Sequence, residues 1–511
     1  MANSNNNIGY FPQMPVCDKH FFSELSSDFS LPDYQPEIKR LLSTRISLLP
    51  PSEYLGNSNA SLSAEAHYHV LYLGADNKLY CLKLTDNYSF DVPFEFNSHC
   101  VDTDSVSIIP HSCAESVNVR VLGPRKLNIK SKIKTRVLAT SPMMYSALST
   151  ERHLSSSIEK NIYEVPCLVA KRYVSEPNNV SDFIPMDLSL DTLRVIDVCA
   201  NVLTSECTAS SDKIHVKGEM VVKILYCNDM ESDEPLSIFR KVPFSCALAC
   251  DEVDSAFSYC ALGNICESNV EITEQGLNVE LSYLISVSAQ KNISVPYIND
   301  AYSTECSCES KSSPLFLLSA FRTLNGALTQ NDVFNCEEIK LPKYAKIINT
   351  DARANILELC AENGKLFFKG ECVYQLSYWL DGEYLSIQQS APIKYEIDLR
   401  SSIDDVNFLR WSASATPLSV RARCDEKRMF VDCELQFSAI LQCEDEIEIL
   451  SELNLGEKHK KSRGEVILCY PEKDATLWQI GKHYKQSIKK IRAQNSLGEA
   501  DNAPKSKFLV I

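Results

Sequence analysis

Apolar and polar residues alternate along much of this chain with a period of two, which is typical of β-strands that bury one face. Residues 279–287 and 431–437 show the pattern clearly, since every second residue is apolar and, apart from Leu284, the residues between are polar. Asp76-Asn77 and Asp381-Gly382 provide turn sequences that suit β-hairpins. The pattern therefore predicts a mainly β fold of antiparallel strands.

Two segments depart from this period and are predicted to be helical. Residues 37–42 follow Pro36, a residue that favours the first turn of a helix, and they begin with an acidic side chain. Residues 313–324 form the second candidate helix. The polar, serine-rich segments 146–157 and 299–313 are interpreted as connections.

One pattern occurs three times in the chain. Similar apolar segments end at Tyr72, Tyr226 and Tyr378, which are 154 and 152 residues apart. A period near 150 residues indicates tandem domains, because solenoid repeats are much shorter. We expect three tandem, sandwich-like antiparallel β modules at residues 30–145, 185–300 and 340–450. Two further landmarks follow each tyrosine in the same order, namely Pro93-Phe94, Pro243-Phe244 and Pro392-Ile393, then Leu127-Asn-Ile129, Leu277-Asn-Val279 and Met429-Phe-Val431.

The C-terminal segment, residues 464–511, has a different pattern. An apolar strand is predicted at residues 466–470, followed by Ile480 and Tyr484, which lie one helical turn apart. A second short helical face and an apolar tail then predict a small β-α-α-β domain. Its core is predicted to contain Leu477, Trp478, Ile480, Tyr484, Ile488 and Ile491.

This segment resembles a LysM domain through the turn Asp474-Ala-Thr-Leu-Trp478 and the Ile480 and Tyr484 that follow. The family turn is usually Gly-Asp-Thr-Leu-Trp, so Asp474 replaces a glycine, which often marks a special backbone conformation, and Ala475 replaces an acidic residue. The altered turn retains the expected fold but departs from the family at its glycan contact. The resemblance implies binding of N-acetylglucosamine polymers at Asp474, Ala475, Thr476 and Leu477 together with Asn495, Ser496 and Leu497.

The three modules resemble the SPOCS domain of spore-coat-associated proteins from endospore-forming Firmicutes. The resemblance is carried by residues 31–40, by the Gly-Glu pairs at Gly218 and Gly370, by the Pro-Phe landmark and by residues 125–129. The first copy departs from the pattern, with Ala64 in place of the glycine. Three such domains followed by a LysM domain are similar to clostridial spore-morphogenesis proteins that interact with the coat-basement ATPase.

This resemblance implies a non-enzymatic sporulation scaffold that anchors or assembles the spore coat through protein–protein contacts. It would act from the mother-cell cytoplasm, be recruited to the forespore surface, and bind a protein of the coat basement layer. The alternative hypothesis is a peptidoglycan-binding protein of the cortex or cell wall that uses the LysM-like domain.

Charge is distributed unevenly along the chain. The formal net charge is −16, yet residues 457–511 contain twelve Lys/Arg and six Asp/Glu, a net of +6, which leaves −22 for the rest. The acidic body argues against nucleic acid as a partner, because a phosphate backbone requires a basic surface. In the basic tail, Lys482, Lys485 and Lys489 have the spacing of one helix face and predict contact with an acidic partner. A solvated lysine-rich surface is the alternative.

The sequence lacks the motifs of common enzyme classes, including a phosphate-binding loop, a dinucleotide fingerprint, a nucleophile elbow and His-Glu-x-x-His. We therefore expect no enzymatic activity and no cofactor. His67 and His69 share one face of a predicted strand, and His99, Cys100, His111 and Cys113 follow, but their spacing does not match structural zinc sites, so no metal is predicted. Without a signal peptide or an apolar run of about 20 residues, no transmembrane segment is expected.

Overall fold

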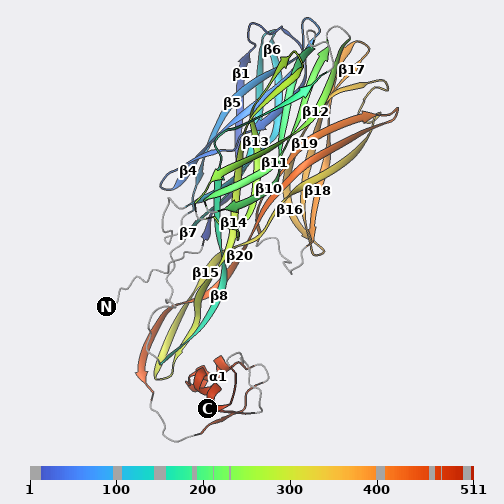
Figure 1. The fold of residues 1–511 in the computed structure, drawn as a ribbon. Coiled ribbons are helices and arrows are strands. Elements are labelled where there is room, and N and C mark those ends of the chain that lie inside the picture. The colour runs from blue at the N-terminus through green and yellow to red at the C-terminus, as the bar shows by residue number, and fades with distance from the viewer. Residues whose placement is uncertain are drawn as a thin grey trace.

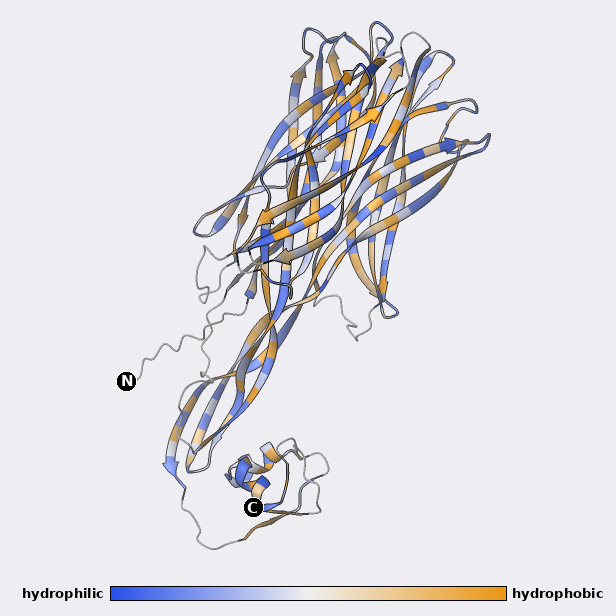
Figure 2. Ribbon diagram, viewed as in Figure 1, coloured by the Kyte–Doolittle hydropathy of each residue, from blue (hydrophilic) through white to orange (hydrophobic). Residues whose placement is uncertain are grey.

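The computed structural model describes residues 13–95, 106–142, 157–186, 193–210, 212–228, 232–251, 253–398, 409–459, 466–472, 475–498 and 508–511. Strands dominate this part of the chain, and its two helices are short and lie near the C-terminus. The prediction of a mainly β fold is confirmed. The alternation of apolar and polar residues continues along most strands (Figure 2).

No helix of the described residues combines the length and the apolar character needed to cross a membrane.

The first module contains two antiparallel sheets. One sheet has β7 at its centre, and the other has β4 at its centre with the short β3 paired to part of it. The strands of the first sheet, in order, are β1 (Gln13–Ser30), β7 (Lys126–Pro142) and β6 (Ser107–Gly123), and those of the second are β2 (Ile38–Leu48), β4 (Asn59–Gly74) and β5 (Leu79–Pro93), with β3 (Ser52–Leu55).

The second and third modules repeat the two three-stranded sheets of the first, but the additional short strands differ, because β3 pairs with β4 whereas β9 (Asn178–Pro185) pairs with the last strand of the second module. With β3 and β9 left out of the count, the first strand of each module pairs with the last, and the second, third and fourth strands form the other sheet. The second module contains β8 (Ile158–Val174), β14 (Gly276–Ser303) and β13 (Ser258–Thr273), with β9 (Asn178–Pro185), and then β10 (Leu193–Ser210), β11 (Lys213–Asn228) and β12 (Ser232–Ala249). The third contains β15 (Cys306–Asn335), β20 (Arg428–Lys458) and β19 (Leu409–Cys424), and then β16 (Lys346–Glu362), β17 (Lys365–Leu380) and β18 (Glu383–Asp398).

The sequence landmarks fall on equivalent buried positions of the three modules. Tyr72, Tyr226 and Tyr378 lie on β4, β11 and β17 and are all buried. The later landmark places Leu127, Leu277 and Met429 at the start of the last strand of each module, where all three are fully buried. The predicted ranges 30–145, 185–300 and 340–450 begin after β1, β8 and β15, which complete one sheet in each module.

The glycine of the Gly-Glu landmark is required by a bulge on the neighbouring strand. A Cβ atom at Gly218 would lie 2.0 Å from the carbonyl oxygen of Leu203, and one at Gly370 would lie 2.2 Å from that of Asn355. The register of the neighbouring strand shifts next to each glycine. In the first module the pairing along this edge of β4 is also irregular, because Leu48 pairs with Ala66 and Ser52 with Ser63, so three residues face Ala64 and Glu65.

The two predicted helices are wrong. Residues 38–42 belong to β2, which pairs with β4, and residues 313–324 lie within β15, which pairs with β20. A bulge between Leu41 and Ser43 breaks the period of two, so that apolar residues recur with helix-like spacing. A similar shift lies between Ala320 and Arg322.

The predicted connection at 299–313 is also wrong, because it contains the end of β14 and the start of β15. Most of the predicted connection at 146–157 lies outside the described residues.

Four strands extend beyond the modules as a narrow stalk toward the C-terminus (Figure 1). β14, β15 and β20 are 28, 30 and 31 residues long, and β8 pairs along β14 as far as Ser303. Ile298 and Ala301 of β14 pack with Leu450 of β20 in the stalk core. The stalk thus joins the second and third modules and carries their strands to the C-terminal segment.

The C-terminal segment contains β21 (Leu468–Cys469), α1 (Leu477–Tyr484), α2 (Ile488–Gln494) and β22 (Leu509–Val510), and β21 pairs with β22. We call residues 466–511 the C-terminal module. Most of the predicted core residues are confirmed, because Leu477, Ile480 and Ile491 are buried and Tyr484 and Ile488 pack against them. Cys469, Leu509 and Ile511 complete this core.

Candidate functional site

The turn predicted to bind glycan forms the start of α1. The Thr476 hydroxyl accepts a hydrogen bond from the backbone N–H of Gln479 at 3.2 Å, and the Gln479 side chain accepts one from the Thr476 N–H at 2.9 Å. This reciprocal pair caps the helix. Leu477 is buried in the core, Ala475 packs against it, and Asp474 lies outside the described residues.

The loop after α2 also has a structural role, because its side chains form hydrogen bonds and apolar contacts within the C-terminal module. The Asn495 side chain accepts a hydrogen bond from the Val510 N–H at 2.7 Å and donates to the Val510 and Ile491 carbonyls at 2.8 Å each. Asn495 therefore ties α2 to β22. Leu497 packs against the core, and Ser496 is exposed with φ of +51°. Of the described residues in the predicted glycan site, Thr476 and Ser496 are the exposed ones.

The predicted basic helix face is not formed. α1 ends at Tyr484, Lys485 follows in the left-handed conformation with φ of +55°, and α2 begins at Ile488. Lys482 and Lys489 therefore lie on different helices. The Lys485 ammonium lies 3.3 Å from Nδ1 of His459, and Lys489 is exposed.

Trp478 is not a core residue of the C-terminal module, which corrects the prediction. It is half-buried and faces the stalk, where its indole N–H donates to Oδ2 of Asp300 at 2.9 Å. The Lys482 ammonium donates to both carboxylate oxygens of Asp300 at 2.7 Å. Asp300 thus holds the first helix of the module on β14 by charge-assisted contacts.

Tyr302 on β14 forms the second part of this contact. Its ring meets that of Trp478 edge-on, with centroids 5.0 Å apart, and its hydroxyl donates to the Gln486 carbonyl at 2.7 Å. Burial, together with the charges of Glu159 and Asp300, raises the pKa of the Tyr302 hydroxyl. Gly481 makes the approach possible, because a Cβ there would lie 2.4 Å from the Tyr302 hydroxyl oxygen.

A second candidate site lies where the three modules meet. The second strand of each module has a bulge at the same position, between Leu41 and Ser43, Val195 and Asp197, and Ile347 and Asn349. The bulged residues of all three modules, Leu42, Ile196 and Ile348, pack in one shared hydrophobic cluster.

Polar contacts at this junction form a closed cycle between the modules. Nδ1 of His69 in the first module lies 2.9 Å from Oδ1 of Asp197 in the second. Lys223 of the second module donates to the Asn349 side chain and the Thr350 carbonyl of the third. Gln375 of the third module donates to the backbone of the first, at the Leu42 carbonyl, over 3.2 Å. The equivalent positions 69, 223 and 375 therefore each reach the next module.

Arg45 is the centre of an ion cluster that joins all three modules. Its guanidinium lies 3.1 Å from Asp197 and 3.5 Å from Asp351, and its Nη2 lies 2.9 Å from Nδ1 of His69. Burial alone would raise the pKa of Asp197, but the Arg45 charge and the His69 hydrogen bond hold that pKa well below its usual range. Burial, reinforced by Arg45, lowers the pKa of His69.

Candidate metal ligands from three strands meet beside this cluster. Ligand atoms of His69, Cys81 and Asp197 all lie within 4.8 Å of one another. The guanidinium of Arg45 already provides a cation in contact with two of the three residues, and a metal ion would compete with it. Local spacing could not indicate this group, because His69, Cys81 and Asp197 come from β4, β5 and β10.

The other histidines considered for a metal site are separate. His67 contacts Glu65 at 2.9 Å. Burial lowers the pKa of His111, on β6, to about 4. His99 and Cys100 lie outside the described residues.

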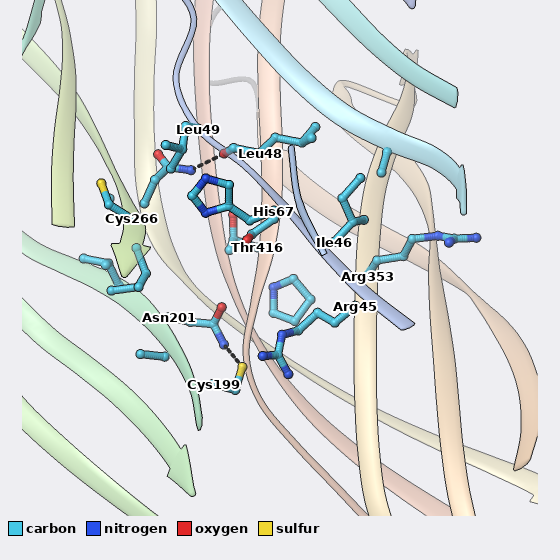
Figure 3. A pocket seen from close by; sticks show the side chains of 18 of the residues that line it. Arg45, Ile46, Leu48, Leu49, His67, Cys199, Asn201, Cys266, Arg353 and Thr416 are labelled. Atoms are coloured by element: carbon cyan, nitrogen blue, oxygen red, sulfur yellow. Dashed lines mark hydrogen bonds between the residues drawn. The ribbon is translucent and has the colours of Figure 1, made fainter. Parts of the chain in front are cut away.

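A chamber of about 670 Å³ adjoins the ion cluster and is lined by all three modules. Figure 3 shows Arg45, His67 and Asn201 around it, with Thr416 of the third module nearby. Asn201 donates to the Leu418 carbonyl across the junction at 3.4 Å, and Asn264 donates to the Leu48 carbonyl at 2.8 Å. The walls are thus fixed by contacts between modules.

One comparison with known protein families finds a match. The family model described as "SipL, SPOCS domain" matches residues 191–281, which extend from β10 into β14 of the second module. The match supports a SPOCS-containing sporulation protein. Searches of curated proteins and of solved structures find no match.

Proposed function

We propose that this protein is a non-enzymatic sporulation scaffold that anchors or assembles the spore coat at the forespore surface through protein–protein contacts. The match of residues 191–281 to the SPOCS family carries the proposal. The shared strand order of all three modules extends the same architecture over the body of the chain. The chain would act from the mother-cell cytoplasm, with a coat basement-layer protein as its partner.

The joined modules suit a scaffold. Contacts of Arg45, Lys223 and Gln375 across the junction favour one rigid body over three independent units. The C-terminal module, interpreted as LysM-like, is held at the far end of the stalk by Asp300. The protein would therefore present two distinct surfaces, one on the body and one on the C-terminal module, at a fixed separation.

Peptidoglycan binding by the C-terminal module is the alternative function. Thr476 and Ser496 are exposed in the two loops that the LysM resemblance associates with glycan. However, the Thr476 hydroxyl caps α1, and the Asn495 side chain holds β22. These structural roles, together with the replaced turn residues, favour a protein partner.

Deletion of the gene tests the scaffold proposal in sporulating cells. Electron microscopy of the deletion strain should show coat material that is detached from the forespore or misplaced, and the full-length gene should restore adherent coat. A deletion strain with normal, adherent coat would contradict the proposal.

Sedimentation with purified peptidoglycan tests the alternative. The full chain and a chain that ends at residue 456 should sediment equally if the C-terminal module binds protein. Retention of the full chain only, unaffected by moderate salt, would favour the cell-wall function.

A further inference from the structure

We propose that the chamber between the three modules binds a small organic anion that carries carboxylate or phosphate groups. The volume of the chamber, about 670 Å³, lies in the range of small-molecule sites. Because every module contributes to the walls, a bound ligand would contact all three at once.

Each module contributes one basic side chain that forms no ion pair within 4.0 Å among the described residues, although the charge of Glu371 acts on the third of them, Arg353. Lys83 of the first module donates to the Ser268 carbonyl, and Lys223 of the second donates to Asn349 and to the Thr350 carbonyl. Arg353 of the third module lies between the chamber and a smaller cavity of about 30 Å³. Neutral oxygen atoms solvate Lys83 and Lys223 but leave the charges of these two lysines uncompensated.

The carboxylates of the lining do not balance these cations. Asp351 is engaged by Arg45, and Glu65 contacts His67. Glu267 is the remaining acidic residue of the described lining, and its Oε1 accepts a hydrogen bond from Asn269 at 3.0 Å. Lys223 and Arg353 are partly buried, and burial of a cation is costly, so an anion that enters the chamber would be stabilised by both.

Hydrogen-bond donors without a partner are available in the same walls. Ser414 Oγ and Arg353 Nε are buried without a hydrogen-bond partner, and both residues line the chamber. Oxygen atoms of a carboxylate or phosphate are acceptors for such donors. Lys83 is exposed, so it marks a side of the chamber that meets solvent and where an anion would first be attracted.

Calorimetry on the full chain tests the proposal, with inorganic phosphate and citrate as probes at constant ionic strength. We expect saturable binding of at least one probe, and the preferred probe distinguishes a phosphate site from a carboxylate site. Lys223→Met and Lys83→Met should each weaken binding about tenfold or more, because a charge-assisted contact is lost. Lys217→Met is the matched control, since Lys217 lies on the same strand as Lys223, is exposed and pairs with Glu206 outside the chamber.

Lys83→Met keeps the test decisive if the Lys223 variant fails to fold, because Lys83 is exposed. Absence of saturable binding of both probes to the folded wild-type chain would overturn the proposal. The proposal would also be overturned if the Lys83→Met and Lys217→Met variants bound the probe equally strongly.

Discussion

The indole N–H of Trp478 and the carboxylate of Asp300 form a 2.9 Å hydrogen bond that joins the C-terminal module to the stalk. The Lys482 ammonium contacts the same carboxylate, so one acidic residue of β14 receives two donors from α1. The module is thus held in a defined position relative to the body. The first two predictions concern this contact.

Asp300→Asn should loosen the C-terminal module without unfolding it. The substitution removes the ion pair to Lys482 and weakens the bond to Trp478, while the module core of Leu477, Ile480 and Ile491 remains intact. Hydrogen exchange should become faster in β14 around Tyr302 and unchanged in the core strands of the body. Lys489→Ala, an exposed change in the same module, is the control. Loss of all structure in the module would show that the contact is part of its folding.

Gly481→Ala should release the module from the stalk, because the added methyl group would lie 2.4 Å from the Tyr302 hydroxyl oxygen. Tyr302→Phe removes that oxygen, so the double variant should recover much of the docking that the single variant loses. Chemical shifts of the Trp478 indole report the docked state. If the single and double variants undock to the same extent, the added methyl group does not act through the Tyr302 hydroxyl.

Arg45→Met should destabilise all three modules together. The change leaves Asp197 and Asp351 buried without their cation, a loss of about 3–5 kcal/mol for a broken buried ion pair. Urea unfolding should remain one transition, shifted to lower denaturant. Lys217→Met breaks an exposed pair and should cost at most about 1 kcal/mol. Separate transitions for the modules would contradict the cooperative junction.

His111 should make the fold less stable in mild acid. Burial lowers its pKa to about 4 in the folded state, whereas an unfolded histidine titrates near 6.5. As pH falls from 7 to 5 the unfolded chain takes up a proton that the folded chain does not, which costs roughly 2 kcal/mol. His111→Gln should remove that part of the decline in the free energy of unfolding. Exposed His483→Gln should leave the decline unchanged.

The sequence predicts the mainly β fold, and its landmarks repeat because the same positions are buried in each module. Tyr72, Tyr226 and Tyr378 recur since each is buried on the central strand of the corresponding sheet, β4, β11 or β17. Bulges explain the wrong helices, because the extra residue Leu42 turns an alternating pattern into one with helical spacing. A single sequence does not distinguish these two causes of the same apolar spacing.

The sites were less predictable because they depend on contacts between distant segments. Trp478 looks like a core residue in its local pattern, and only Asp300, far earlier in the chain, shows that it faces the stalk. Likewise, Arg45 forms ion pairs with Asp197 and Asp351, and the three residues lie on strands that are far apart in the sequence and share no local motif. Periodicity identifies which residues avoid water but not which surface covers them.

Affinity purification from sporulating cells tests the scaffold account most directly. The tagged full chain and a tagged chain that ends at residue 456 should be recovered in equal amounts from matched cultures. The account predicts that one abundant coat basement-layer protein is recovered with the full chain and is lost with the shortened one. Recovery of the same protein with both chains, or of peptidoglycan fragments in its place with the full chain, would contradict the account.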